Sequence, residues 1–516
     1  MMGLKRLINR PAWILAVALL LIWVDCPAFL DEDSAFYPRI SSGLETSLLQ
    51  VNSVQGSSEP LPARPGLWHP FRAWDDLKDS LLEAFSPGQP ERALLQYAQR
   101  DRPVDFLGEL NFVAGYEQRY DDPGAYGFLY KGVGFNSVLN GRFRLRALWW
   151  NGAYLGDRQA AEASPLLDSF YTSREDALRL DNLNADISYR NSWFTAALGR
   201  GKFQLGSSVS GSLILSDRVN DYGYFLAEGR VGDFQLSFLH GSLMAAREPE
   251  PARGATDIIP DKYVALHQVS YSPSECLKLF GGETIIYGNR GIDLNYLLPH
   301  TFWRVTEHNQ GDRDNVLIFA GLDLQPTRNL SLYLNGVLDE LTYSRLFTSW
   351  WGNKYALQTG AALALPSLSL TSQAPPRFLL EFTAVRPWTY THYSNQTMYS
   401  HDGIGLGYAK GSNLLDLTAE LDLPLREWLT FCAQYSHTWQ GSEGNIWALD
   451  YSDYFQGSQV DNATCSWLEG DLSRISKLQG SLRFDLLAHH SLLLAHTAQF
   501  GSSPRYQWVG SWQFKF

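Results

Sequence analysis

The last twelve residues of the chain, 505–516, alternate between two kinds of side chain. Aromatic residues and one glycine hold one parity, polar residues hold the other, and Val509 is the exception. A period of two with an aromatic face and a polar face is typical of a β-strand with lipid on one side and water on the other. Chain ends usually fray in water, so aromatic residues at this end indicate the closing strand of a transmembrane barrel.

The same alternation recurs through the chain from residue 104 onward. It is found at 106–116, 143–149, 183–189, 234–238, 316–324, 330–338, 378–384, 415–423, 429–435 and 482–486. A soluble sandwich shows alternation too, but the length of this region and the Trp and Tyr at strand ends favour a membrane barrel. Roughly 23 residues per strand and connection predict an all-β fold, a transmembrane antiparallel β-barrel of about 18 strands within the range 16–18.

The connections between these segments differ in length, as they do in outer-membrane barrels. Residues 140–141 (Asn-Gly) form a tight hairpin, whereas 153–180, 242–261, 288–314 and 439–473 are long. We expect the long connections to be extracellular or folded into the lumen. We also expect the last strand to pair with the first, near 106–119.

The N-terminal part has a different composition. Residues 1–28 combine Lys5, Arg6 and Arg10 with an apolar stretch and small residues near Ala28, which predicts a cleaved signal peptide. A membrane anchor or a lipid-modified Cys26 are the alternatives. Residues 29–103 are predicted to be a periplasmic segment with helices at 73–85 and 91–99, and residues 104–516 to be the outer-membrane barrel. This segment would act as a cap or plug beneath the barrel, or as a simple tether.

Charge and motifs exclude several classes of function. The net charge is −12, and removal of the basic signal peptide makes the chain more acidic, so we expect no nucleic-acid partner. The mature cysteines Cys276, Cys432 and Cys465 cannot all pair with one another, and we assign them structural or incidental roles in place of catalytic ones. Hydrolase signatures and metal-ligand spacings are absent from the sequence, so we expect no enzymatic activity, no cofactor and no metal.

Three arginines, Arg142, Arg144 and Arg146, share the inward parity of one predicted strand. Guanidinium groups so close together repel one another unless they meet carboxylates or an anionic ligand. Glu109 and Glu117 lie on a neighbouring predicted strand. Two interpretations follow, a luminal salt-bridge network or a contact for an anionic sugar or ion.

The predicted loops are rich in aromatic residues. They include Phe347, Trp350, Trp351 and Tyr355, then Trp388, Tyr390, His392 and Tyr393, and finally Trp447, Tyr451, Tyr454 and Phe455. Aromatic faces beside amides and carboxylates suit sugar rings, which have apolar C–H faces and hydroxyl edges. They suit the packing of long loops equally well. Trp350 and Trp351 are the candidate glycan contacts of this set.

Two stretches resemble the capsule assembly protein Wzi family. The first has Ala-Leu-Gly-Arg-Gly at 197–201 and Gly-Ser-Leu-Ile-Leu-Ser-Asp at 211–217. The second has Gly-Gly-Glu-Thr-Ile-Ile-Tyr-Gly at 281–288 and Leu-Asn-Tyr-Leu-Leu-Pro-His at 294–300, followed by motif residues that continue to 340. The sequence departs from the family pattern at 203–206 and 218–221.

This resemblance implies an 18-stranded outer-membrane barrel with extra periplasmic helices that holds surface polysaccharide as a lectin-like protein. Its candidate luminal or glycan-contact residues are Arg290, Arg304, Glu307, His308, Asp314, Asn315, Asp339 and Glu340. Residues 201–219 interrupt the alternation and suit a short helix or a segment folded into the lumen. If that segment and 287–315 fold inward, they would constrict the lumen.

The leading hypothesis is a barrel in the bacterial outer membrane that takes part in capsule or surface-polysaccharide assembly or attachment. Its partners would be outer-membrane lipid and the polysaccharide, and contact with export machinery on the periplasmic side stays open. The alternative is a porin-like channel for small solutes.

Overall fold

The computed structural model describes residues 45–46, 95–99, 106–121, 124–140, 142–162, 171–173, 179–245, 260–274, 276–340, 342–345, 348–371, 375–448, 454, 463–487, 490–502 and 504–515. The predicted signal peptide and the predicted helix at 73–85 lie outside these residues. Among the described helices, none is long and apolar enough to cross a membrane.

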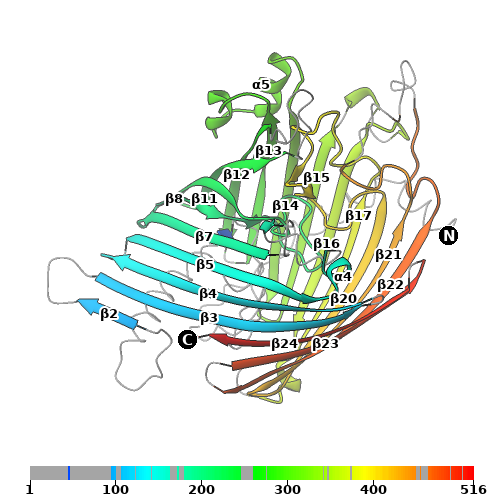
Figure 1. Ribbon diagram of the computed structural model, residues 1–516. Coiled ribbons are helices and arrows are strands. Elements are labelled where there is room, and N and C mark those ends of the chain that lie inside the picture. Colours follow the sequence, from blue (N-terminus) through cyan, green and yellow to red (C-terminus); the bar gives the residue numbers. More distant parts are fainter. Residues whose placement is uncertain are drawn as a thin grey trace, which may run out of the picture.

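Within the described part of the chain, 18 antiparallel strands close into one barrel, which confirms the predicted fold (Figure 1). The strands of the wall are β3 (Phe106–Asp121), β4 (Ala125–Leu139), β5 (Phe143–Gly156), β7 (Arg179–Arg190), β8 (Phe194–Gly201), β10 (Tyr222–Val231), β11 (Phe234–Met244), β12 (Asp261–Ser274), β13 (Leu277–Gly288), β14 (Asn315–Thr327), β15 (Leu330–Glu340), β16 (Lys354–Ala364), β17 (Arg377–Val385), β20 (Leu414–Arg426), β21 (Leu429–Gln440), β22 (Ser473–Leu487), β23 (His490–Gly501) and β24 (Arg505–Lys515). The minor elements are β1 (Glu45–Thr46), β2 (Leu95–Gln99), β6 (Tyr171–Ser173), β9 (Phe203–Gln204), β18 (Ser400–His401), β19 (Ile404–Gly405), α4 (Arg158–Glu162), α5 (Trp303–Asn309) and the 3-10 helices η4 (Leu294–Leu297), η5 (Tyr343–Arg345) and η6 (Pro366–Leu368).

The barrel closes where β24 pairs with β3, as the alternation of the last residues predicts. Trp512 lies opposite Tyr116 in this pairing, which extends along β3 from Val113 to Asp121. The remaining edge of β3 pairs with β2, where Leu95 lies opposite Leu110. The helix predicted over 91–99 is therefore wrong. An exposed strand edge offers unpaired backbone groups, and pairing with it outweighs the local preference for helix.

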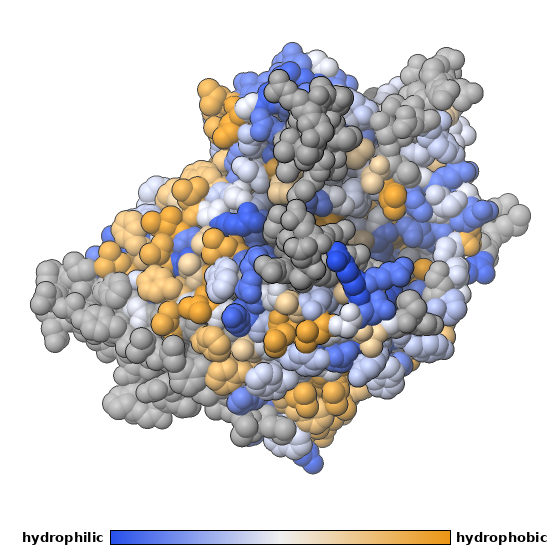
Figure 2. Space-filling view, in the orientation of Figure 1, coloured by the Kyte–Doolittle hydropathy of each residue, from blue (hydrophilic) through white to orange (hydrophobic). Residues whose placement is uncertain are grey.

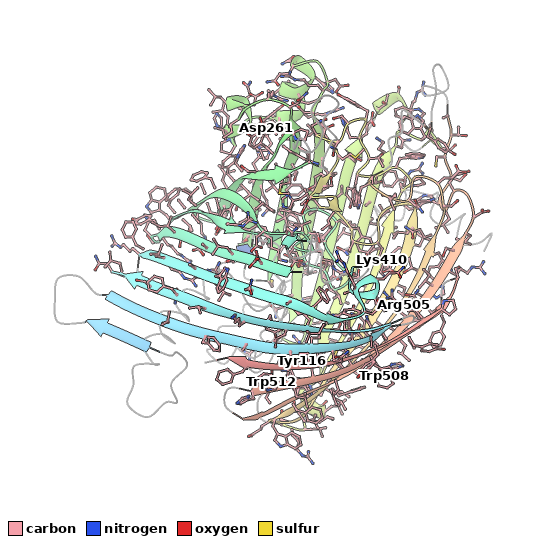
Figure 3. All side chains as sticks on the ribbon, viewed as in Figure 1. Tyr116, Asp261, Lys410, Arg505, Trp508 and Trp512 are labelled. Carbon is pink, nitrogen blue, oxygen red and sulfur yellow. The ribbon has the colours of Figure 1, made fainter. Side chains whose placement is uncertain are left out.

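The two parities of the strands face lipid and lumen as predicted for a membrane barrel. Tyr506, Trp508 and Trp512 of β24 are exposed on the outer face, whereas Arg146 and Asp186 are buried on the inner face. Figure 3 labels Trp508, Trp512 and Tyr116 along this closing seam, and Figure 2 shows many hydrophobic side chains on the wall. The outward, apolar side chains of the wall are thus suited to contact with lipid tails.

The connections also divide as predicted. Most short turns, such as 191–193, 232–233 and 328–329, join strands at one rim, which is periplasmic by the rule for such barrels. The long connections 202–221, 289–314, 386–413 and 441–472 join strands at the opposite rim.

The assignment of the two faces predicts a difference between neighbouring residues of β22. Leu478 faces outward opposite Tyr435, whereas Gln479 faces the lumen opposite Gln434. We expect Leu478→Arg to lower the free energy of unfolding by about 2–4 kcal/mol, the cost of a cation on the lipid face near the bilayer midplane. Gln479→Arg should change it by less than about 1 kcal/mol. Denaturant unfolding in phospholipid vesicles measures both, and equal losses would contradict the assignment.

Candidate functional site

Residues 202–221, here called the plug, run from β8 into the lumen. The plug side chains Phe203, Leu205, Leu213, Ile214 and Leu215 are all fully buried. They share one hydrophobic cluster with residues of the connection 386–413, here called the mouth connection. The backbone N–H of Ser216 donates to the carbonyl of Leu406 (2.7 Å), which joins the two segments. The prediction of a segment folded into the lumen is confirmed, and it forms turns and the short strand β9 in place of a helix.

Polar side chains from the far wall hold the plug. Ser207 Oγ donates to Asp323 of β14 (2.9 Å). The backbone N–H groups of Val209 and Ser210 donate to the carboxylate of Glu381 on β17 (2.7 and 3.0 Å). Two further bonds run from the wall to plug carbonyls, from Asn335 Nδ2 to Ser207 (2.7 Å) and from Gln358 Nε2 to Gly211 (2.9 Å). Each buried polar group left without a partner costs about 1–3 kcal/mol, so these bonds define the position of the plug.

Glycines allow the plug to turn within the lumen. Gly206 and Gly211 have φ angles of +91° and +125°. Side chains other than glycine rarely adopt such angles. The small residues that break the sequence alternation at 201–219 therefore have a structural cause.

The mouth connection is fixed by residues that the sequence predicted as ligand contacts. Asp339 accepts a hydrogen bond from the backbone N–H of Tyr390 (2.7 Å). Asn315 Nδ2 donates to the carbonyl of Thr397 (2.9 Å). Glu340 pairs with Lys354 (3.0 Å). Asn315 and Asp339 therefore anchor the mouth connection. Glu340 forms an ion pair at the end of β15.

The connection 289–314, here called the outer loop, does not enter the lumen with the plug. It stands beside the outer ends of β12 and β13, where Figure 1 shows α5. Arg290 binds Asp314 through both guanidinium nitrogens (2.8 and 2.6 Å), and the hydroxyl of Tyr296 donates to the same carboxylate (2.7 Å). Arg290 and Asp314 thus close the base of the outer loop.

A second charged group lies on α5. Arg304 Nη1 lies 3.0 Å from Glu307 and 3.6 Å from Asp312, and His308 lies 3.6 Å from Asp312. The carboxylate and imidazole donors of Glu307, His308 and Asp312 lie within 4.8 Å of one another. Arg304 already supplies the positive charge between the two carboxylates. Burial raises the pKa of Glu307 to about 7, and nearby Asp312 adds to this effect against the opposing Arg304.

The arginines of β5 are separated by the structure. Arg146 pairs with Asp186 of β7 (2.7 Å), and Arg144 donates to Asn136 of β4 (3.0 Å). Arg142 is exposed at the periplasmic turn. The predicted partner Glu117 pairs with Arg119 on its own strand instead.

This error has a physical cause, because β4 lies between β3 and β5. Its inward residues Tyr126, Phe128 and Tyr130 are aromatic and buried. The strand therefore lacks the alternation of apolar and polar residues that predicts its neighbours β3 and β5.

The aromatic residues of the outer connections divide into packed and exposed sets. Trp351 is 3% exposed and packs edge-on against Trp388 at 6.4 Å between ring centres. Trp350 is half-buried with the guanidinium of Arg345 at 5.0 Å from its ring centre. Tyr393 and Tyr454 are exposed. Loop packing thus accounts for Trp351, and Tyr393 and Tyr454 present the more accessible rings.

Two of the three mature cysteines lie in the barrel wall and in an outer connection. Cys432 faces the lumen on β21 opposite Ser481, and Cys465 is buried in the connection 441–472. Both are free thiols. Burial raises the pKa of the Cys465 thiol to about 12, so it stays protonated and unreactive near neutral pH.

Comparison with known proteins gives matches to solved structures alone. No protein-family model and no curated protein matches the chain. One solved structure is Wzi, described as an outer-membrane protein involved in group 1 capsule assembly in Escherichia coli and as a carbohydrate-binding β-barrel. It is 14% identical, with a TM-score of 0.51 over 79% of this chain and 84% of that chain.

Two proteins of Pseudomonas aeruginosa also match. OccK11 (OpdR) is 11% identical with a TM-score of 0.45, over 80% of this chain and 96% of its own. OprD is 9% identical with a TM-score of 0.44, over 84% and 99%. The likeness to Wzi, with a TM-score above 0.5, shows a shared fold, that of an outer-membrane β-barrel.

The raised pKa of Glu307 predicts that the outer loop loses stability as pH rises. The folded loop binds the proton more tightly than the opened loop, so its stability is highest below the ordinary pKa near 4.5 and falls until about pH 7. Hydrogen exchange of α5 amides, corrected for intrinsic rates, should show this loss of protection. Glu307→Gln should remove the pH dependence and His308→Gln should leave it. An unchanged dependence in Glu307→Gln would contradict this assignment.

Proposed function

We propose that this chain is a non-enzymatic outer-membrane barrel that binds surface polysaccharide and helps to organise it at the cell exterior. The observation that carries this proposal is the plug, which occupies the lumen and is hydrogen-bonded to four strands of the far wall. A diffusion channel needs an open lumen. A protein with a segment fixed inside its lumen and long connections at the outer rim is better suited to holding a ligand outside.

The outer connections supply groups that suit sugars. Tyr454 packs against Trp388 at 4.9 Å between ring centres, and its hydroxyl donates to Glu443. Tyr393 donates its hydroxyl to the carbonyl of Arg313 (3.0 Å) while its ring stays exposed. Such rings are held in fixed positions with an open face, which suits the C–H face of a sugar. A repeating polymer gains avidity from several weak contacts of this kind.

The likeness to the carbohydrate-binding barrel Wzi supports the same proposal at the level of the fold. A porin-like channel is the second candidate. The observation that favours it is the exposure of Lys477 and Gln479 on the luminal face of β22, away from the main contacts of the plug.

Glycan binding by the purified barrel tests the role of the exposed rings. An array of bacterial surface polysaccharides should give at least one ligand. Tyr454→Ala and Tyr393→Ala should each weaken its binding by about 2- to 10-fold, which corresponds to about 0.5–1.5 kcal/mol for one aromatic contact. Trp508→Ala, on the lipid-facing wall, serves as the matched control and should bind as the parent does. Loss of polysaccharide binding in the control alone, or no binding at all by the parent, would contradict the proposal.

A further inference from the structure

The outer loop lies against the outer face of the barrel wall. His267 of β12 and Glu283 of β13 stand opposite each other on the parity that also carries the exposed Val269 and Leu279. That parity faces outward. Trp303 of α5 stacks on His267 with ring centres 4.1 Å apart and planes at 18°. The outer loop therefore covers the outer face of these two strands.

Hydrogen bonds fix the outer loop in this position. The carboxylate of Glu283 accepts from the backbone N–H groups of Trp303 and Arg304 (2.7 and 3.4 Å) and pairs with His267 (3.2 Å). Around them Phe238, Ala265, Ile285, Val316 and Tyr296 form a buried cluster with Trp303. A carboxylate and an imidazole on a lipid-facing parity would be costly in hydrocarbon. Trp303 shields this pair.

The height of this contact places the outer loop beside the bilayer. Phe234 and Tyr271 stack at the periplasmic ends of β11 and β12, with ring centres 4.6 Å apart, and both are exposed. Such rings mark the interfacial girdle of outer-membrane barrels. His267 is four residues from Tyr271, or about 13 Å along the strand at roughly 3.3 Å per residue. The apolar band of these barrels is about 25 Å tall, so Trp303 lies within its height.

The outer loop carries a set of exposed apolar side chains beside exposed polar residues such as His308 and Asp312. The apolar set, with exposed fractions, is Ile292 (54%), Leu294 (74%), Leu298 (45%), Phe302 (77%) and Val305 (60%). Figure 2 shows a group of hydrophobic side chains beside hydrophilic ones in the region where Figure 1 labels α5. An apolar set of this size on an outer connection requires a partner. Meanwhile Arg290 and Asp314 at the base of the loop pair with each other, so their charges are not presented to that partner.

We propose that the outer loop is a lipid-binding element whose apolar face, Ile292, Leu294, Leu298, Phe302 and Val305, inserts among the acyl chains of the outer leaflet. The proposal rests on continuity with the lipid-facing wall and on the height of Trp303. It does not depend on whether the protein binds polysaccharide. The occupant is the surrounding membrane, so the loop widens the lipid-facing surface of β11 to β14 and keeps the His267–Glu283 pair dry.

Spin labels on the full chain in vesicles of dioleoylphosphatidylcholine test this proposal. In a background with Cys276→Ser, Cys432→Ser and Cys465→Ala, labels are placed by Leu294→Cys and Val305→Cys. Leu478→Cys on the wall provides the lipid reference, and Tyr393→Cys at the mouth provides the water reference. Collisions with oxygen should exceed collisions with nickel ethylenediaminediacetate at Leu294→Cys and Val305→Cys, as at Leu478→Cys.

Two results would overturn the proposal. One is a collision ratio at both loop positions equal to that at Tyr393→Cys, which would place the face in water. The other is dipolar coupling between labels on separate molecules at the loop positions, which would show a second copy as the occupant. Heat-dependent gel mobility confirms that each variant is folded. Polysaccharide binding of Leu294→Cys and Val305→Cys, measured separately, should equal that of the parent and distinguishes this proposal from the proposed function.

Discussion

Every backbone N–H and C=O group at membrane depth needs a hydrogen-bond partner from the protein, because hydrocarbon offers none. The pairing of β24 with β3 meets this requirement by removing the last open edge of the sheet. Closure with so many strands creates a second requirement. A barrel of 16 to 18 strands encloses a lumen wider than its own side chains fill, so another part of the chain must fill it or water will.

The plug and the mouth connection occupy the part of the lumen beside β14 to β17. The plug brings apolar side chains to the centre, but it also brings backbone groups that need partners away from water. Glu381, Asn335 and Gln358 supply these partners from strands that are distant from the plug in sequence. Polar residues on the luminal face of the strands thus hold the plug in place as well as contacting water. The outer loop does the reverse on the outer face, where it covers His267 and Glu283.

The sequence allowed the barrel, its closing pair and the inward plug to be predicted because each depends on a local pattern. The period of two reveals a strand when its faces differ in polarity, and small residues with an apolar run reveal a break in that pattern. The pattern does not reveal β4, because aromatic residues occupy its luminal face. The wrong partners predicted for Arg146 follow from this, because β3 and β5 are not adjacent when β4 lies between them.

The candidate site could be predicted less well. Trp351 and Asp339 have the residue types of a sugar site, but packing and hydrogen bonding within the connections use them. Whether a loop aromatic is buried or exposed depends on contacts between connections far apart in the sequence, such as 341–353 with 441–472. The position of the outer loop on the outer face depends likewise on Trp303 meeting His267, a pairing that no local pattern encodes.

We infer that the plug closes the lumen to diffusion. Conductance of the purified full chain in planar lipid bilayers tests this inference most directly. We expect the barrel to insert without a large, steady open conductance. A large and steady open channel from the unmodified protein would contradict it and would favour the porin-like function.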